Sequence, residues 1–463
     1  MTKTTAATSS QDIVRIEPSH RLRGEYRPPA DKSISHRALI LAAMAAGRST
    51  VSPVSGSADV ASTAHCLRTL GVRIDQTADA WIVESPGITG WRQPSKPLEC
   101  GNSGTTMRLL TGCLAGCPLT STLTGDASLN RRPMLRIADP LRAMGAMIEL
   151  SDDGTPPVTV TGGALRGIDY ELPVASAQVK SALLFAGLTA TDALTINERH
   201  VSRDHTELMF KALDIPCVLE HPPRYADERE RLLDPSQAVA WPEGIERRIR
   251  LQCPAQSRPH EWRIPGDFSA AAFFIGAALG VRQADLTIDD VLLNPTRIGL
   301  LKVLKRMGAE IESHRESARS GEPFGRIRVS TCGELKATRV GESEIATLID
   351  ELPVLAVVAA NAHGVTVIRG AGELRSKESD RIAAVAVNLR AMGAKVAELE
   401  DGWAIEGPTE WHGASLDSFG DHRIAMAFAV AALWADGPSE IRNAHVAAVS
   451  DPEFFAIVRS LTQ

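Results

Sequence analysis

One short phrase recurs along this chain, and it constrains the fold more than any single motif does. The phrase occurs as CLRTLGVRI at 66–74, PLRAMGAMI at 140–148, VLKRMGAEI at 303–311 and NLRAMGAKV at 388–396, with a looser KALDIPCVL at 211–219. In each copy Leu and Met recur at helical spacing, a basic residue lies in the last turn, and Gly usually supplies a left-handed cap. The phrase therefore predicts the end of a helix followed by the start of a strand. The C-terminal EFFAIVRSLTQ at 453–463 is a candidate sixth copy that simply stops.

A second kind of helix alternates with these copies. Six helices rich in Ala and Leu are predicted, and they begin near Ser33, Ser103, Ser176, Phe268, Leu352 and His422. A strand such as ALTIN or DLTID follows most of them. A single copy of the phrase would be explained by the ordinary way in which helices end, but six units in a fixed order are not. We expect six helix–strand–helix–strand units, each with one buried apolar helix and one amphipathic helix.

The length and the rhythm of the repeat predict two domains. A chain of 463 residues is too long for one comfortable hydrophobic core. The segment from His221 to Arg263 is rich in Pro, Arg and Glu, and it interrupts the repeat after the third unit. We place the boundary near Trp262 to Gly266, with three units on each side. The predicted domains are residues 21–265, and residues 1–20 together with 266–463.

Composition excludes several classes of protein. The net charge of −6 argues against a general binder of nucleic acid or membranes. The seven cysteines form no CxxC pair, so neither a disulfide framework nor a zinc site is indicated. The segment Met1 to Gln11 is polar and lacks the pattern of a secretory signal, and the longest apolar runs span about a dozen residues where a membrane span needs roughly 20. We expect a cytoplasmic monomer without metal or other cofactors.

Basic residues are predicted at helix starts, where the helix dipole disfavours positive charge. The motifs DKSISHR, GNSGTTMR, SAQVK, LRSKESDR and GDHR all show this pattern. In NRRPM, Pro133 is a natural first helical residue, which places Arg132 at the cap. The residues concerned are Lys32, Ser33, Arg37, Asn102, Gly104, Thr105, Arg108, Arg132, Ser176, Gln178, Lys180, Arg375, Lys377, Glu378, Asp380, Arg381, His422 and Arg423.

Taken singly, each of these cations is explained by a solvated surface charge. Cations and backbone donors that converge at several helix N-termini, however, form a site for an anion carrying phosphate or carboxylate. Two other places favour structural interpretations. In IDELP, Asp350 and Glu351 precede Pro353, which is typical of an ordinary helix N-terminus. Cys113 and Cys117 lie one turn apart in an apolar helix, where buried free thiols are the common case.

The motifs together resemble those of the 5-enolpyruvylshikimate-3-phosphate synthase family. They are DKSISHR, GNSGTTMRLL, RRPM, SAQVKSALL, SRDHTE, GDFSAAAFF, DELP, LRSKESDR and GDHRIAM, in this order from residue 31 to 426. The resemblance implies an α/β fold of two similar domains, each built from three βαβαββ units as an inside-out α/β barrel, with the active site in the interdomain cleft. It also implies that Ile13 to Pro18 forms a strand that packs on the second domain.

The resemblance implies a reaction as well. The family transfers the enolpyruvyl group of phosphoenolpyruvate to the 5-hydroxyl of shikimate 3-phosphate, releasing phosphate through a tetrahedral adduct, in the shikimate pathway of aromatic amino-acid biosynthesis. Its members are the target of glyphosate, which competes with phosphoenolpyruvate and reaches slightly further, into space bordered by the glycine that matches Gly104. The nearest alternative is the enolpyruvyl transferase acting on UDP-N-acetylglucosamine, although its catalytic cysteine loop is absent here. A non-catalytic repeat protein that binds phosphorylated ligands is the alternative from another class.

Residues carry over from the family by position. Those matching ligands of shikimate 3-phosphate are Ser33, Arg37, Ser176, Ala177, Gln178, Ser202, Arg203, Asp350 and Lys377. Those matching the phosphoenolpyruvate site are Lys32, Gly104, Arg132, Arg381 and Arg423, and Asn102 and Thr105 are also expected to bind substrate. Four residues are expected to be catalytic, with Asp350 and Glu378 handling protons, Lys32 stabilising charge and His422 assisting. The neighbouring cations should lower the pKa of Glu378.

The sequence also departs from the family pattern at two positions. Val449 stands where many members carry a lysine before the C-terminal proline-aromatic motif, and no lysine follows Lys395. The phosphate-binding clamp is therefore expected to have one cation fewer. Leu109 stands where many members carry proline. Both differences bear on the kinetic constants rather than on the reaction.

Overall fold

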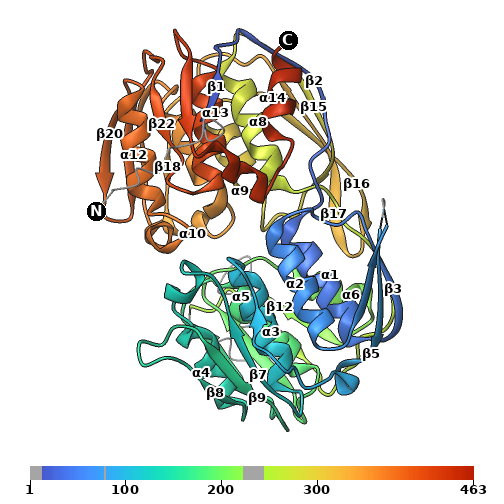
Figure 1. Ribbon diagram of the computed structural model, residues 1–463. Coiled ribbons are helices and arrows are strands. Elements are labelled where there is room, and N and C mark those ends of the chain that lie inside the picture. The colour runs from blue at the N-terminus through green and yellow to red at the C-terminus, as the bar shows by residue number, and fades with distance from the viewer. Residues whose placement is uncertain (1–12, 78–79, 223–243) are drawn as a thin grey trace, which may run out of the picture.

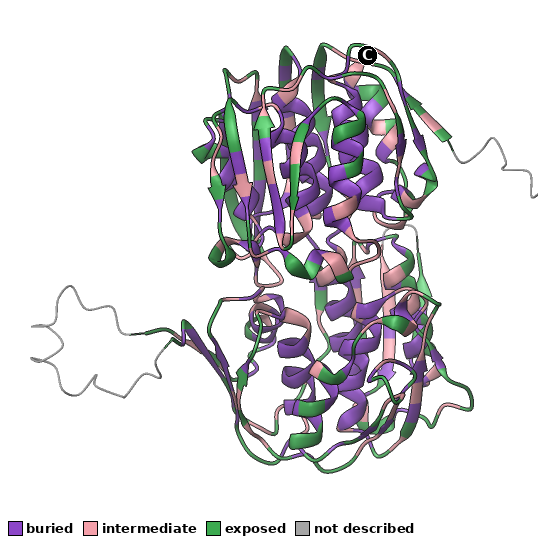
Figure 2. Cartoon of the chain, turned by 90° about the vertical axis from the view of Figure 1, so that its left-hand side faces the viewer, coloured by how far each residue is buried: buried purple, intermediate pink, exposed green. Residues whose placement is uncertain are grey.

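Two lobes stack on one another in the computed structural model of this protein, which describes residues 13–77, 80–222 and 244–463. Figure 1 shows the lower lobe in blue to green and the upper lobe in yellow to red, with the blue N-terminal segment running along the upper lobe. Six sheets lie around bundles of helices. Figure 2 shows that the helices inside each lobe are largely buried, while exposed residues gather on the sheets outside. The helices are therefore inside, as the family resemblance implied.

The lower lobe contains three four-stranded sheets, whose strands all come from residues 46–263. In the order in which the strands pair, these sheets are β14 (Glu261–Arg263), β3 (Ala46–Ser52), β5 (Trp81–Pro86) and β4 (Arg73–Gln76); β6 (Leu98–Glu99), β7 (Thr120–Thr124), β9 (Val158–Thr161) and β8 (Met147–Glu149); and β10 (Asp169–Leu172), β11 (Leu194–Glu198), β13 (Arg247–Leu251) and β12 (Cys217–Glu220). In each sheet the first pair is parallel and the other two pairs are antiparallel.

The upper lobe repeats this topology with the remaining strands. Its sheets are β2 (Arg21–Tyr26), β15 (Gln283–Leu292), β17 (Glu322–Ser330) and β16 (Ile311–Arg319); β18 (Arg339–Val340), β19 (Gly364–Ile368), β21 (Gly402–Gly407) and β20 (Lys395–Leu399); and β22 (Ser415–Asp417), β23 (Ser439–Arg442) and β1 (Ile13–Ile16). Each again has one parallel pair followed by antiparallel pairs. Within the described residues, the six predicted units thus correspond to five four-stranded sheets of one topology and a sixth, three-stranded sheet with one parallel and one antiparallel pair.

The two kinds of helix follow the sequence pattern. The apolar helices are α1 (Lys32–Met44), α3 (Gly104–Ala115), α5 (Ala177–Gly187), α8 (Phe268–Gly280), α11 (Leu352–Ala359) and α13 (His422–Ala432). Each begins within one residue of its predicted start, and each is buried along nearly its whole length. The amphipathic helices are α2 (Ala58–Thr69), α4 (Leu135–Ala143), α6 (His205–Ala212), α9 (Gly299–Arg306), α12 (Arg381–Ala391) and α14 (Phe454–Thr462). The candidate sixth copy therefore forms a helix, α14.

Small residues allow the buried helices to approach closely. A Cβ atom added to Gly112 of α3 would lie 2.2 Å from the carbonyl oxygen of Ala182 in α5. In the upper lobe, a Cβ atom on Gly276 of α8 would lie 2.6 Å from the Val354 side chain of α11. Because glycine has no Cβ, the backbones can pack at these points without displacing a neighbour. The close packing brings the N-termini of the buried helices to the same end of each lobe, where the lobes meet.

The N-terminal strand lies where the family resemblance placed it. β1 pairs antiparallel with β23, so Ile13 to Ile16 belong to the upper lobe. β2 also joins the upper lobe, through its parallel pairing with β15. Strand pairing therefore favours a crossing between the lobes after Tyr26, rather than after residue 20, and a second crossing between β14 and α8. The domain limits themselves stay a proposal.

Three further expectations concern the helix start at Pro133, the segment that interrupts the repeat, and membrane-spanning helices. The prediction that Pro133 begins a helix is wrong, because α4 starts at Leu135. Arg132 is instead the residue that follows a short 3-10 turn, η2 (Leu129–Arg131). Of the segment that interrupts the repeat, residues 223–243 lie outside the described residues. In the described ranges, no helix combines the length and apolar character that crossing a membrane requires.

Candidate active site

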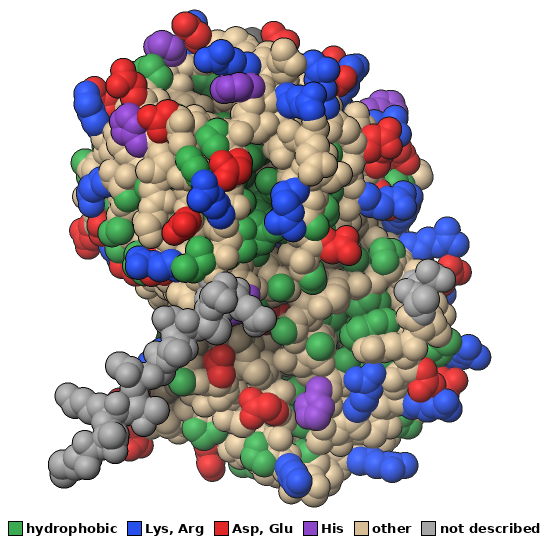
Figure 3. All heavy atoms as spheres, turned by 45° about the horizontal axis from the view of Figure 1, so that its top comes forward, with side chains coloured by type: hydrophobic (Ala, Val, Ile, Leu, Met, Phe, Trp, Pro, Cys, Tyr) green, Lys and Arg blue, Asp and Glu red, His purple; other side chains and the backbone are tan. Residues whose placement is uncertain are grey.

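A cavity of about 520 Å³ lies between the lobes and is lined from both. Its lower wall comes from the starts of α1, α3 and α5 and from the loops before α4 and α6. Its upper wall comes from the turns before α11 and α12 and from the start of α13. On the outer face drawn in Figure 3, basic and acidic side chains are mixed. The cavity, in contrast, gathers cations that helix N-termini aim into one space.

All predicted site residues except Arg37 line this cavity. They are Lys32, Ser33, Asn102, Gly104, Thr105, Arg132, Ser176, Ala177, Gln178, Ser202, Arg203, Asp350, Lys377, Glu378, Arg381, His422 and Arg423. The motifs that carry them are spread over nearly 400 residues of sequence. The fold brings them together because each belongs to the same end of its own repeat unit.

Arg37 and Lys180 differ from expectation, because neither lines the cavity. Arg37 is 3% exposed, and its guanidinium donates to Thr206 Oγ1 at 2.9 Å and to the carbonyl oxygen of Ser33 at 2.9 Å. In this structure Arg37 holds the backbone of Ser33 from behind the cavity wall. Lys180 is fully buried, with its Nζ 2.7 Å from Glu207 and 3.1 Å from Glu198. The inclusion of Lys180 among the anion-binding cations is wrong.

Glu378 lies among cations from both lobes. Its Oε2 is 2.7 Å from Nη2 of Arg381 in the upper lobe, and its Oε1 is 3.8 Å from Nη2 of Arg132 in the lower lobe. Burial favours the neutral acid, but the positive charges, above all that of Arg381, outweigh it and hold the pKa of Glu378 well below its usual range. The expected lowering of this pKa is confirmed. Glu378 is ionised in the substrate-free site.

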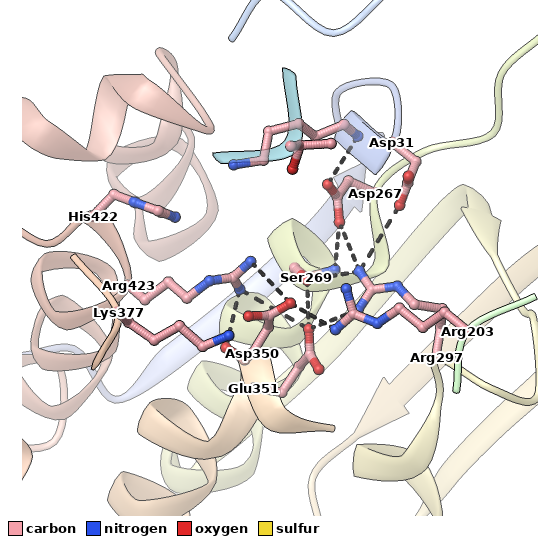
Figure 4. Close-up of polar contacts among 12 residues, drawn as sticks. Asp31, Arg203, Asp267, Ser269, Arg297, Asp350, Glu351, Lys377, His422 and Arg423 are labelled. Atoms are coloured by element: carbon pink, nitrogen blue, oxygen red, sulfur yellow. Dashed lines mark hydrogen bonds and ion pairs between the residues drawn. The ribbon is translucent and has the colours of Figure 1, made fainter. Parts of the chain in front are cut away.

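Asp350 is a second carboxylate shared between the lobes. It accepts a hydrogen bond from Arg203 Nη2 at 2.6 Å and lies 3.8 Å from Arg423 (Figure 4). It also lies 3.7 Å from Arg381. Burial opposes ionisation, but these cations hold the pKa of Asp350 well below its usual value. The interpretation of Asp350 as an ordinary helix start does not describe its contacts, because the N-cap of α11 is Glu351 and the Asp350 carboxylate pairs with arginines of the cavity wall. The neighbouring Glu351 is the buried, structural carboxylate, and it accepts from Ser269.

Lys32 and His422 complete the inner part of the site. Lys32 Nζ lies 2.9 Å from Asp59 Oδ2, and this carboxylate outweighs burial to raise the pKa of Lys32. His422 is 4% exposed, and burial lowers its pKa to about 4. Its Nε2 has no hydrogen-bond partner among the described residues, and Figure 4 shows its ring pointing from α13 toward the middle of the site. A neutral imidazole beside a lysine that stays charged can donate a hydrogen bond to a ligand or accept one from it.

Gly104 borders the most cationic corner of the cavity. A Cβ atom added there would lie 2.9 Å from Nη1 of Arg108 and 3.3 Å from Nη1 of Arg132. Burial, with the nearby charges of Arg136 and Arg132, lowers the pKa of Arg108 to about 9. Cations that repel one another in this way are stabilised when an anion lies between them. The corner is therefore suited to a small anion that approaches the backbone closely.

Sequence reasoning missed several residues of the wall. Arg136 lines the cavity from the first turn of α4, and it makes no hydrogen bond or ion pair within the described part of the chain. The rule that singled out cations in the first helical turn could have found it. Asp59, at the start of α2, and Arg297, just before α9, gave no comparable signal. Their roles depend on partners that are distant in sequence.

Cysteines and metal-binding groups contribute little here. Cys113 and Cys117 are free and buried, as the apolar helix predicted. No group of three or more His, Cys, Asp or Glu side chains among the described residues could hold a metal ion. The ionisable groups that line the cavity are carboxylates, guanidinium groups, lysines and the imidazoles of His200 and His422.

Comparison with known proteins gives consistent results. The family model described as EPSP synthase (3-phosphoshikimate 1-carboxyvinyltransferase) matches residues 16–224 and 242–458. A 3-phosphoshikimate 1-carboxyvinyltransferase from Chloroflexus aurantiacus is 47% identical over 438 residues, covering 94% of this chain and 95% of that protein. One from Salinibacter ruber is 46% identical over 448 residues, covering 96% and 98%.

Solved structures agree with the sequence relatives. An EPSP synthase from Acinetobacter baumannii superposes with a TM-score of 0.82 at 37% identity, covering 97% of this chain and 98% of that one. The enolpyruvyl transferase NikO from Streptomyces tendae has the same fold, with a TM-score of 0.70 at 17% identity and 97% of each chain covered.

Proposed function

Because the chain belongs to the EPSP synthase (3-phosphoshikimate 1-carboxyvinyltransferase) family, we propose that it transfers the enolpyruvyl group of phosphoenolpyruvate to the 5-hydroxyl of shikimate 3-phosphate. The reaction releases phosphate and belongs to the shikimate pathway of aromatic amino-acid biosynthesis. The observation that carries this function is the cavity between the lobes, where Asp350 and Glu378 lie among cations that come from both lobes. Both substrates are anions with a phosphate group, and such a site suits them.

We assign two groups of lining residues to the two substrates. Ser176, Gln178, Ser202, Arg203 and Lys377 line it together and are assigned to shikimate 3-phosphate. The corner formed by Gly104, Arg108, Arg132, Arg381 and Arg423 is assigned to phosphoenolpyruvate, because guanidinium groups bind carboxylate and phosphate through paired hydrogen bonds. Val449 ends the 3-10 turn η6 (Ala444–Val449) and does not line the cavity.

The proposed mechanism is addition followed by elimination. The 5-hydroxyl of shikimate 3-phosphate attacks C2 of phosphoenolpyruvate while the methylene carbon gains a proton and becomes a methyl group. Asp350 accepts the hydroxyl proton, and Glu378 delivers and later removes the methyl proton. The bond between C2 and the phosphate oxygen then breaks, and phosphate leaves with the electron pair. Removal of the methyl proton restores the carbon–carbon double bond. Lys32 and the arginines stabilise the negative charge of the tetrahedral adduct.

A carboxylate with a very low pKa does not hold a proton near neutral pH. The mechanism therefore requires bound substrate to raise the pKa values of Asp350 and Glu378. The cations that keep Asp350 and Glu378 ionised are the ones assigned to the substrate anions. When phosphate and carboxylate groups neutralise these cations, the pKa of each carboxylate rises toward the neutral range. Proton transfer is thereby coupled to occupation of both subsites.

Phosphate release tests the function directly. The purified protein is incubated with phosphoenolpyruvate alone, with shikimate 3-phosphate, or with UDP-N-acetylglucosamine. Release that requires shikimate 3-phosphate supports the proposal. Release with the UDP-sugar would instead assign the protein to the related enolpyruvyl transferases, and binding without release would make it a non-catalytic protein. A cytoplasmic monomer is also proposed, and light scattering during gel filtration measures its oligomeric state.

Gly104→Ala is expected to weaken glyphosate more than phosphoenolpyruvate. The added methyl group would point at the guanidinium groups of Arg108 and Arg132, where the longer inhibitor needs space. We expect the inhibitory concentration of glyphosate to rise about tenfold or more, a difference of about 1.4 kcal/mol, and the KM for phosphoenolpyruvate to rise less. Parallel inhibition and saturation curves measure both. Gly163→Ala is the control, because its methyl group would meet nothing within 4 Å. If the binding of both ligands weakens equally, Gly104 is needed only for the backbone conformation at the start of α3.

Shikimate 3-phosphate is expected to draw the lobes together. Arg203 in the lower lobe and Lys377 in the upper lobe are both assigned to it, so one ligand would bridge the cleft. The lobes already meet through the Arg203–Asp350 and Arg132–Glu378 pairs, so the expected movement is a further closure about these contacts. Small-angle scattering should show a smaller radius of gyration with the ligand than without it. Shikimate, which lacks the phosphate, is the control, and an unchanged radius with shikimate 3-phosphate would contradict closure.

A further inference from the structure

A short loop of the upper lobe, outside the motifs described above, makes hydrogen bonds to the lower lobe. Residues 294–297, here called the junction loop, lie in the upper lobe between β15 and α9. Asn294 is fully buried, and its amide nitrogen donates to Asp204 Oδ1 at 2.8 Å and to Glu322 Oε2 at 2.9 Å. Its amide oxygen accepts from the backbone nitrogen and the hydroxyl of Thr296. Both amide hydrogens and both oxygen lone pairs of Asn294 are therefore used.

The first arm of the junction loop reaches the cavity through the lower lobe. Asp204, held by Asn294, lies 3.6 Å from Arg247. Its Oδ1 is also 3.2 Å from Thr296 Oγ1, as the alternative acceptor for the one hydroxyl hydrogen that the closer Asn294 Oδ1 takes at 2.8 Å. Asp204 directly follows Arg203, whose guanidinium donates to Asp350 at 2.6 Å. The backbone around Arg203 is thus fixed from the opposite lobe by the Asn294 hydrogen bond to the next residue.

The second arm acts within the upper lobe and at the crossings. Arg297 is 2% exposed and donates from Nη2 to Ser269 Oγ at 2.8 Å, with Nη1 3.5 Å from Glu351 Oε1 (Figure 4). The same guanidinium lies 3.5 Å from Asp267 and 3.9 Å from Asp31. These two aspartates cap the first helices after the two chain crossings, α8 and α1.

Because its polar groups are buried, this loop is not explained by a role in holding the two lobes together alone. Taking charged and amide groups out of water is costly, and well-packed apolar side chains would join two lobes at least as stably. What a fully paired polar network provides is fixed orientation, because each hydrogen bond has a narrow range of lengths and angles. The groups oriented here are the immediate neighbours of Arg203 and Asp350.

We propose that the junction loop is a positioning element of the reaction: Asn294 fixes Arg203 through Asp204, and Arg297 fixes Asp350 through Glu351. This inference rests on the function proposed above, in which Arg203 binds shikimate 3-phosphate and Asp350 takes its hydroxyl proton. Asn294 does not line the cavity and touches no substrate. Its effect on the acceptor substrate is therefore indirect.

The test replaces Asn294 with aspartate, which keeps the shape but removes both donors and places a carboxylate against Asp204. We expect the KM for shikimate 3-phosphate to rise about tenfold or more, with the KM for phosphoenolpyruvate changing less than about threefold. The matched control is Asn388→Asp, because Asn388 is also buried and donates its amide to the Asp417 carbonyl at 2.8 Å, away from the junction. The control is expected to lower the melting temperature by a similar amount without changing either KM.

A rescue variant separates positioning from stability. Adding Asp204→Asn to Asn294→Asp restores a donor and an acceptor with reversed polarity, and the KM for shikimate 3-phosphate should return to within about threefold of the wild type. A lower melting temperature with an unchanged KM in Asn294→Asp would overturn the proposal. If that variant does not fold, Thr296→Val removes the hydroxyl that holds the Asn294 amide oxygen and lies against Asp204, and an unchanged KM there overturns it equally.

The proposed function is tested separately from the junction loop. Wild-type protein that releases phosphate with shikimate 3-phosphate establishes the function whatever the variants do. If the wild type releases none, titration calorimetry with shikimate 3-phosphate still measures the loop, since Asn294→Asp should weaken binding about tenfold and the Asn388 control should not. Equal affinity in the two variants would overturn the positioning role.

Discussion

Replacing Glu378 with glutamine is expected to lower turnover by about 10² to 10⁴, the usual contribution of a general acid–base group, while substrate affinity stays near that of the wild type. Glutamine keeps the shape and can still accept from Arg381, which donates to Oε2 at 2.7 Å. It cannot carry the proton to and from the methylene carbon. Phosphate release measures turnover, and calorimetry with shikimate 3-phosphate measures affinity.

Glu342→Gln is the matched control for this loss of charge. Glu342 lines the same cavity but is exposed, and no hydrogen bond or ion pair of its side chain occurs in the described part of the chain. Removing its charge is expected to change turnover less than about threefold. Near-normal turnover in Glu378→Gln would remove Glu378 from the mechanism, and equal losses in the two variants would point to the field of the cavity rather than to proton transfer.

Lys180→Met is expected to destabilise the protein by about 3–5 kcal/mol, the cost of breaking a buried ion pair from one side. Lys180 is fully buried between Glu198 and Glu207. Without it, Glu207 keeps only Arg247, at 3.9 Å, and a carboxylate remains buried with little compensation. Urea unfolding followed by circular dichroism measures the change in the free energy of unfolding.

Two further variants define this effect. Glu207→Leu added to Lys180→Met removes the stranded charge, and it should recover most of the lost stability. Lys395→Met breaks an exposed pair with Glu406 at 3.0 Å, and it should cost less than about 1 kcal/mol. A loss of that small size in Lys180→Met would show that the buried network is compensated by water or by rearrangement.

Much of the fold could be predicted because its signals are local. The phrase LRxxGA predicts a helix end by the spacing of Leu and Met, the basic last turn and the glycine cap, and such signals act within a few residues. Each of the six apolar helices begins within one residue of its predicted start for the same reason. The exception is α4, which begins two residues after Pro133, and residues 132–134 separate it from η2. A helix start is less certain where two short helical turns compete.

Much of the site could also be predicted, since its residues lie at helix N-termini that the repeat aligns. Cations at or just before helix starts go against the helix dipole, and this anomaly is visible along the chain. Lys32, Arg132, Arg381 and Arg423 were recognised in this way, and the same rule would have included Arg136.

The sequence by itself determined the six repeat units, their buried helices and the gathering of cations at helix starts, because those features depend on spacing within one segment. Only the tertiary structure decided which cations reach the cavity. Arg37 and Lys180 follow the same local pattern as Arg108, yet their side chains enter the protein interior, where buried acceptors hold them. Asp350 and Asn294 show the converse, since their partners Arg203 and Asp204 come from the opposite lobe. The reason is that an ion pair depends on distance in space, and that distance exists only once the two lobes have packed.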